Sequence, residues 1–119
     1  MPGVVVKGFE IYQRDGVLAA VNSWFAGSAR ENDGGLQDEA VARLERVGSW
    51  LGSMFDYELV RNVPLSASTR RVYLAVKYQK GVAWMWFDCY RPGDQWIVTR
   101  FDFSTNANNI LPPNILGGQ

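Results

Sequence analysis

The sequence predicts an α+β fold, in which three N-terminal helices pack on one face of a four-stranded antiparallel sheet. Two observations predict it. Apolar residues recur at helical spacing through the first half of the chain, whereas from Phe55 onward they recur at every second residue. Helices followed by a run of strands is the order typical of α+β proteins. The 119 residues are enough for one core, so we expect a single domain over residues 1–119.

Three apolar stripes predict the helices. The first covers residues 5–12 and is interrupted at Asp15-Gly16, and the second covers residues 17–25. A polar loop with the turn signal Asn32-Asp33-Gly34-Gly35 separates them from a longer stripe over residues 36–54. The opposite side of this third stripe is charged, which is typical of an amphipathic helix lying on another element.

Four strands follow, each bounded by turn residues. We expect them over residues 55–63, 70–79, 82–91 and 95–104. Pro64 ends the first because it has no N–H to donate to a neighbouring strand. Lys80-Gly81 makes a tight hairpin, and Pro92-Gly93-Asp94 makes the last turn. Residues 106–119 are expected to form an irregular tail, whose apolar members could dock on the body: Ile110, Leu111, Ile115 and Leu116.

Both faces of these strands carry large apolar groups, which an ordinary half-buried strand does not show. We pair the first hairpin with Gln79 opposite Val82 and close the next one over residues 91–95. One face is then almost wholly apolar and should receive the helices. It holds Val72, Leu74, Val76, Tyr78, Ala83, Met85, Phe87, Cys89, Ile97, Thr99, Phe101 and Phe103. A bulge or a one-residue slip would exchange residues between the faces.

The reverse face carries five aromatic rings beside charged groups, and we interpret it as a dimer interface. Its expected residues are Arg71, Tyr73, Trp84, Trp86, Asp88, Tyr90, Trp96 and Arg100. Five such rings would exceed the largest apolar patch of a typical monomer, ~300–600 Å². Charges of both signs suit a two-fold dimer, in which the patch meets its own copy. The alternative is that the C-terminal tail folds back over the rings.

The amino-acid composition limits the kinds of catalytic site, metal site and partner that we expect. The chain has no His and one Cys, and its twelve basic and twelve acidic residues cancel. These counts remove the commonest general base and metal ligand near neutral pH, an intrachain disulfide or thiolate metal site, and the basic excess of nucleic-acid binders. No apolar run reaches the ~20 residues that span a bilayer. We therefore expect no metal, cofactor, nucleic-acid partner or membrane span, and a soluble protein that is cytoplasmic unless a leader has been removed.

Candidate reactive groups are few. The sheet carboxylates Asp56, Glu58, Asp88 and Asp102 are expected to point to the reverse face and to form ion pairs there, although a bulge could turn one inward. Cys89 is interpreted as a small buried hydrophobe, because no His can lower its pKa. No catalytic residue is assigned. Six large side chains either line an apolar pocket or fill it as core: Trp24, Trp50, Tyr57, Tyr78, Met85 and Phe101.

Three segments carry a resemblance to a known superfamily. They are residues 15–28 with Gly16-Val17 and Trp24-Phe25-Ala26-Gly27-Ser28, the helix through Leu44 to Leu51, and residues 93–103 with their turn, Trp96 and alternating last strand. They resemble the nuclear transport factor 2-like superfamily, the cystatin-like α+β cone, and in particular small bacterial members of unassigned function. The resemblance covers roughly residues 4–112.

The resemblance implies a curved, cone-shaped sheet, a conical pocket between sheet and helices, and dimers that pair through the outer sheet face. Enzymes of the superfamily, such as steroid isomerases, polyketide cyclases, dehydratases and epoxide hydrolases, place Asp, His, Tyr or Arg inside the cone. This chain departs from them, because its expected inward face offers only Tyr78, Thr99 and Cys89 as polar groups.

We therefore expect a non-catalytic binding or interaction module, homodimeric through the outer sheet face and able to take a small apolar ligand. Two alternatives stay open. An enzyme of isomerase, cyclase or hydrolase type would use an inward carboxylate with Tyr57 or Tyr78. A structural subunit would instead pair its outer face with a different protein. A buried carboxylate near a tyrosine would favour the enzyme, and a closed apolar interior would favour the module.

Overall fold

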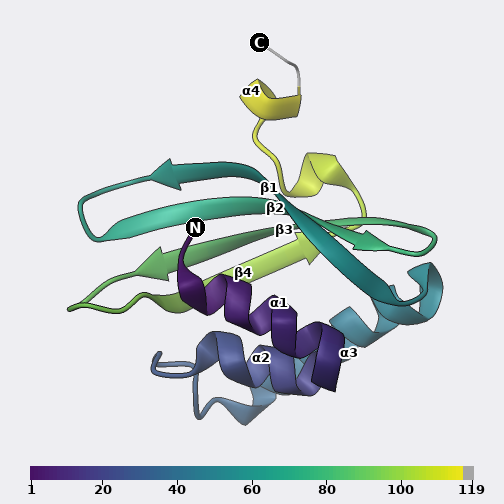
Figure 1. Ribbon diagram of the computed structural model, residues 1–119, viewed down its shortest axis with the longest axis horizontal. Coiled ribbons are helices and arrows are strands. Elements are labelled where there is room, and N and C mark those ends of the chain that lie inside the picture. The colour runs from purple at the N-terminus through teal and green to yellow at the C-terminus, as the bar shows by residue number, and fades with distance from the viewer. Residues whose placement is uncertain (117–119) are drawn as a thin grey trace.

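The computed structural model describes residues 1–116 and places helices on one side of a four-stranded antiparallel sheet (Figure 1). The helices on that side are α1 (Gly3–Asp15), α2 (Val17–Phe25) and α3 (Gly34–Leu51). The strands are β1 (Met54–Pro64), β2 (Thr69–Tyr78), β3 (Gly81–Tyr90) and β4 (Ile97–Ser104). The strands are hydrogen-bonded in chain order, so β1 and β4 are the two edges. The α+β fold predicted from the sequence is confirmed.

The ends of α3 follow from two local signals. At its start the Asp33 side chain accepts a hydrogen bond from the Leu36 N–H at 3.1 Å, which satisfies one of the unpaired donors of the first turn. At its end Gly52 adopts a φ of +88°, a left-handed conformation that favours glycine. The helix therefore stops at Leu51, before the Met54 at which we had ended its apolar stripe, and Met54 begins β1.

Aromatic rings fill the space between the helices and the sheet. Trp24 is fully buried, packs edge-on against Phe9 with ring centroids 5.0 Å apart, and donates its indole N–H to the Val5 carbonyl at 3.2 Å. This close packing depends on Gly8, since a Cβ added there would lie 1.9 Å from Nε1 of Trp24. The indole thus occupies the volume that a side chain at residue 8 would need.

The hairpin between β2 and β3 differs in register from the prediction. Tyr78 lies opposite Gly81, whereas we had placed Gln79 opposite Val82. The N–H groups of Gln79 and Lys80 instead donate to the carbonyls of Ser53 and Leu51, which ties the turn to the end of α3. The difference is two residues, and side chains alternate with a period of two, so every β2 and β3 residue keeps its predicted face.

A bulge in β4 changes which of its residues face the core. Asp88 lies opposite Arg100 and Cys89 opposite Val98, which leaves Thr99 as the extra residue. Val98 is fully buried, while Ile97 and Thr99, the two residues predicted to face the helices, are half-buried. Beyond the bulge the prediction is correct, because Phe101 and Phe103 pack against the main core.

The C-terminal tail crosses the outer face of the sheet, on the side opposite the helices (Figure 1). It contains two short helical turns, η1 (Ala107–Asn109) and α4 (Pro113–Leu116), where we had expected irregular chain. Ile110 and Leu111 are buried against Tyr73 and Trp86, with Ile115 partly buried beside them. Leu116, which was expected to dock, is 41% exposed.

Candidate functional site

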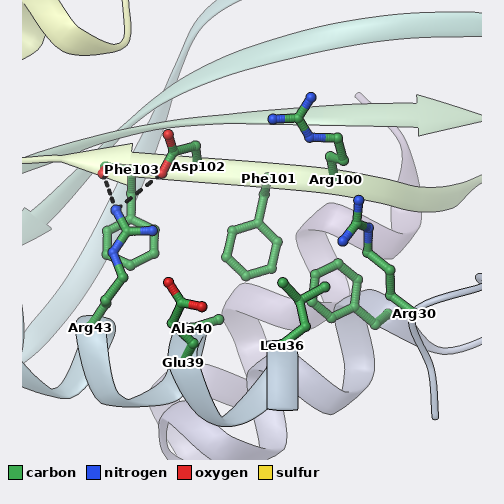
Figure 2. Close-up of a pocket in the computed structure, with 10 residues that line it drawn as sticks. Arg30, Leu36, Glu39, Ala40, Arg43, Arg100, Phe101, Asp102 and Phe103 are labelled. Carbon is green, nitrogen blue, oxygen red and sulfur yellow. Dashed lines mark hydrogen bonds and ion pairs between the residues drawn. The ribbon is translucent and has the colours of Figure 1, made fainter. Parts of the chain in front are cut away.

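A hollow between α3 and the outer edge of β4 is the candidate site (Figure 2). We call it the arginine groove. Its volume of about 370 Å³ lies within the ~300–1,000 Å³ usual for small-ligand pockets. Its walls are formed by Phe25, Arg30, Leu36, Glu39, Ala40, Arg43, Arg100, Phe101, Asp102 and Phe103.

One face of α3 and one edge of the sheet position these residues. Leu36, Ala40 and Arg43 recur three and four residues apart, so they share one side of the helix. On the other wall, β4 is an edge strand, and its outward backbone groups have no neighbouring strand. The groove exists because α3 lies beside this edge.

The floor of the groove is apolar. The rings of Phe25 and Phe101 stack with centroids 5.0 Å apart, and Leu36 and Ala40 face them from α3. Phe25 is buried and Phe101 half-buried, so part of the Phe101 surface is open to a ligand. This floor suits the hydrocarbon part of a ligand.

Arg30 is held at one end of the floor by its backbone and its side chain. Its Nε donates to the Thr99 carbonyl at 2.6 Å, its N–H donates to Ser28 Oγ at 3.2 Å, and its carbonyl accepts from Gln37 Nε2 at 3.0 Å. A guanidinium has five N–H donors, and the Thr99 carbonyl takes one. The terminal nitrogens of Arg30 are thereby fixed at the groove with donors to spare.

Arg43 lies at the opposite end, with Phe101 between the two arginines (Figure 2). One terminal nitrogen donates to Asp102 Oδ1 at 3.1 Å and to the Phe103 carbonyl at 3.2 Å, and its guanidinium lies 4.4 Å from the centroid of the Phe103 ring. Asp102 also accepts from the Phe103 N–H at 2.8 Å. The side chains of Asp102 and Arg43 thus pair with the N–H and the C=O of Phe103, which point away from the neighbouring strand β3.

The backbone of Phe101 also faces the edge. In an antiparallel strand the N–H and C=O groups of alternate residues point to the same side. Those of Phe103 point outward, because Asp102 and Arg43 bind them, so those of Phe101, two residues earlier, point outward as well. A donor and an acceptor of the main chain therefore lie between the two arginines.

Two cations lie at the ends of the groove. Arg30 and Arg43 flank its floor beside the carboxylates Glu39 and Asp102, whereas the guanidinium of Arg100 points away from the groove toward the outer face of the sheet (Figure 2). Asp102 is bound by Arg43, whereas Arg30 forms no ion pair within residues 1–116. The free N–H donors of Arg30 favour an anionic ligand.

The structure does not bring together the six residues predicted to line a pocket. Trp24, Met85 and Tyr78 are buried in the core, and Tyr57 stacks on Phe9 at 4.5 Å. Trp50 is 67% exposed on α3. Phe101 alone of the six lines the arginine groove, Trp50 and Tyr78 each border a different hollow, and Trp24 and Met85 belong to the packed core.

Sequence reasoning missed Arg30 and Arg43, because both looked like solvated charges. A usable signal was present for Arg43. Leu36, Arg43 and Trp50 recur seven residues apart, which places a cation on the same helical face as two large apolar groups. No comparable pattern marks Arg30, whose role depends on the contact with Thr99, distant in the chain.

The residues predicted to form the outer interface differ in their burial and in the part of the molecule that they contact. Tyr73 and Trp86 lie under the tail, Trp84 is half-buried at its margin, and Tyr90 is exposed. Trp96 differs from the prediction. It precedes β4 and packs against the main core, where Arg70 and Arg91 stack on its ring at 4.6 and 5.2 Å.

Charged members of that face are paired or stacked. Arg71 binds Asp88 through two hydrogen bonds, 2.6 and 2.8 Å long, and lies 4.0 Å from the centroid of the Trp86 ring. Asp88 raises the pKa of Arg71 through these bonds. Arg100 lies 5.3 Å from the centroid of the same ring.

The other sheet carboxylates also lie beside cations. Lys77 Nζ is 4.0 Å from Asp56 and 3.7 Å from Glu58, and Arg43 binds Asp102. These distances agree with the ion-pair interpretation of the acidic residues. They leave no acid on the sheet in the isolated, buried setting that general acid catalysis favours.

Polar groups inside the main core are neutral near pH 7. The hydroxyls of Tyr12 and Tyr78 are 2.9 Å apart, and burial raises the pKa of both. Burial raises the pKa of Cys89 to about 12, with a smaller contribution from Asp88, so its thiol keeps its proton. A protonated buried thiol is a poor nucleophile.

Within residues 1–116, no three His, Cys, Asp or Glu side chains gather closely enough to hold a metal ion. No helix in the same range has the length and apolar character needed to cross a membrane. Comparisons with family models, curated proteins and solved structures found no match. The case for a functional site therefore rests on geometry and charge.

Proposed function

We propose that the protein is a non-catalytic binding module and that the arginine groove is its working surface. The ligand has a carboxylate and an apolar body. One observation carries the proposal: Arg30 and Arg43 are fixed at the two ends of an apolar floor. Guanidinium groups match carboxylates in shape and charge, and such charge-assisted hydrogen bonds are stronger than neutral ones.

Preorganisation supports binding at this site. Arg30 is already held by Thr99, and Arg43 by Asp102 and Phe103, so a ligand need not order these long side chains. Ordering such a side chain on binding would cost ~0.5–1.5 kcal/mol. A ligand bound here also covers the open surface of Phe101, which adds an apolar contribution.

The enzyme alternative has weaker support. It requires an inward carboxylate beside Tyr57 or Tyr78. A hollow of about 360 Å³ does reach Tyr12 and Tyr78, but its carboxylate, Glu45, is exposed on α3. An exposed Glu lacks the desolvation that tunes a general base.

A titration with 4-phenylbutyrate tests the proposal. By calorimetry we expect binding with a Kd of about 1 mM, typical of a fragment-sized ligand, and no binding of the uncharged 4-phenylbutanamide. Arg30→Ala should weaken binding about tenfold, which corresponds to ~1.4 kcal/mol. Arg14→Ala is the matched control, because Arg14 is an exposed arginine on α1 outside the groove. Equal losses in the two variants, or no binding of the acid, would contradict the proposal.

Dimerisation through the outer face stays a prediction. The tail covers Tyr73 and Trp86, so a second copy would meet the tail and the surrounding residues Arg71, Trp84 and Tyr90. Sedimentation at micromolar concentration tests it, with twice the chain mass of 13.4 kDa expected for the dimer. A single-chain mass would contradict the prediction and assign the outer apolar cluster to the tail alone.

A further inference from the structure

We infer that the occupant of the arginine groove is an extended acidic segment of another protein, which lies along α3 from the arginine groove to Trp50. This inference rests on the proposed binding function and names its partner class. It starts from a second hollow of about 300 Å³, which shares Arg43 and Phe103 with the groove. We call it the Trp50 hollow; it is lined by Arg43, Arg46, Val47, Trp50, Phe103, Ser104 and Thr105.

The combined length fits a peptide better than a small acid. From Leu36 to Trp50 the face of α3 extends ~21 Å, at 1.5 Å per helical residue. An extended chain rises ~3.3 Å per residue, so a segment of about six residues covers this distance. A single small carboxylate would fill the arginine groove and leave the Trp50 hollow empty.

Charge along the two hollows is complementary to an acidic chain. Arg30 and Arg43 lie at the ends of the arginine groove, and Arg43 and Arg46 line the Trp50 hollow. The arginine groove also has the carboxylates Glu39 and Asp102, whereas the described lining of the Trp50 hollow has none, so the Trp50 hollow is the more cationic of the two. Multiple arginines on one surface are a recurring means of recognising acidic motifs.

Apolar and charged groups follow one another along the two hollows. A segment with both acidic and apolar residues can therefore place carboxylates at the arginines and apolar groups on Phe101, Val47 and Trp50. Trp50 is 67% exposed, and exposed tryptophans are enriched among residues that dominate binding energy.

The edge of β4 limits how much the main chain contributes. Arg30 occupies the Thr99 carbonyl, and Arg43 and Asp102 occupy the backbone of Phe103. The outward groups of Phe101 can pair with a peptide, but a full additional strand would have to displace both arginines. Recognition therefore depends mainly on side chains.

These features favour an acidic peptide over a nucleic acid. A phosphate backbone carries a negative charge at every nucleotide and would place charges beside Glu39 and Asp102, whereas a peptide can have uncharged residues at these two positions. The groove also has an apolar floor formed by Phe25 and Phe101, which accepts amino-acid side chains. We therefore choose a peptide as the occupant and include an oligonucleotide in the test.

The test uses a fluorescein-labelled peptide, Glu-Leu-Glu-Phe-Glu-Leu, and fluorescence anisotropy with the full chain. We expect Trp50→Ala to weaken peptide binding about tenfold and to leave 4-phenylbutyrate binding unchanged, whereas Arg30→Ala weakens both. Leu18→Ala is the control, since Leu18 is 57% exposed on α2 and lines neither hollow. A peptide with Lys in place of Glu should not bind.

The outcomes separate this inference from the proposed function. Binding of 4-phenylbutyrate without binding of the peptide, or peptide binding that Trp50→Ala does not weaken, would overturn the peptide inference and leave the carboxylate site standing. Loss of both ligands would overturn both proposals. Displacement of the peptide by a poly-thymidine oligonucleotide at equal concentration would assign the surface to nucleic acid and also overturn the inference.

Discussion

Both faces of the sheet carry aromatic side chains, but the segments of the chain that cover the two faces are very different. The inner face packs against α1, α2 and α3, and its Phe87 is fully buried against Phe9 of α1 and Trp24 of α2. The outer face is covered by residues 107–116, and its most buried members, Tyr73 and Trp86, keep 9% and 8% of their surface exposed. Apolar groups on both faces of a strand thus need no partner protein, since a short tail of the same chain can cover one of them.

The polar groups on the two sides of the sheet also differ in their exposure to water and in their charge. On the inner side of the sheet the buried hydroxyls of Tyr12 and Tyr78 bind each other. On the outer face Arg71 and Asp88 form a partly exposed ion pair that stacks on Trp86. The outer face, which only the C-terminal tail covers, can therefore hold charged groups, because part of each charged group remains exposed to water.

Replacing one tryptophan by alanine on each side of the sheet gives the largest expected effect on stability. We expect Trp24→Ala to lower the free energy of unfolding by about 3–5 kcal/mol, because a large cavity opens inside a packed core. Trp86→Ala should cost about 2 kcal/mol, since the tail can settle into part of the vacated space. Urea unfolding followed by circular dichroism measures both. Equal losses would show that the two covers stabilise the sheet equally.

Detaching the tail should have a smaller effect. Leu111→Asp places a charge at the buried contact with Tyr73 and Trp86, and we expect it to cost about 1–2 kcal/mol, because docking the tail also loses conformational entropy. Tryptophan emission should shift to longer wavelength as Trp86 meets water. Leu116→Asp, the same change at an exposed site of the tail, should leave emission and stability unchanged. A shift in both variants would contradict the docking contact.

The smallest effect concerns the tyrosine pair. Tyr78→Phe removes the hydrogen bond to Tyr12 and should cost about 1 kcal/mol at pH 7. Burial raises the pKa of Tyr78 above its ordinary value of 10.0. Below pH 10 the folded and unfolded chains both keep this proton. Above it the unfolded chain loses the proton first, so the free energy of unfolding falls as pH rises.

The variant should reduce that alkaline loss. Unfolding experiments at pH 7 and at pH 11 measure it, with Tyr90→Phe as a control because Tyr90 is exposed on the outer face. If Tyr78→Phe and the parent chain lose stability equally between the two pH values, burial of the Tyr78 hydroxyl does not cause the fall in the free energy of unfolding at alkaline pH.

Much of the fold was predictable because side-chain alternation is a local property. The period of the apolar residues identified the helices and strands and the core face of β2 and β3, even though the hairpin register was off by two residues. The bulge at Thr99 was not assigned in advance, since it depends on how β4 pairs with β3. It changed the burial of Ile97, Val98 and Thr99 while leaving Phe101 and Phe103 inward.

The candidate site was less predictable, because its residues are joined by contacts distant in the chain. The neighbour that fixes Arg30 is Thr99, and Asp102 fixes Arg43. Their charges look alike in sequence to those of solvated arginines such as Arg14. The choice between pocket and core for the six large side chains stayed open for a related reason, since the sequence shows which rings are large but not whether they fill the space they surround.

Gly8 has a consequence for recognising relatives of this protein. The indole of Trp24 lies where any side chain at residue 8 would be, so the two positions constrain each other. A homologue that keeps the tryptophan must keep the glycine, and a homologue with a larger residue at the first position must have a smaller one at the second. Glycine and tryptophan at this spacing, on two successive helices, therefore form a paired signature that could identify distant members of a family before any function is assigned.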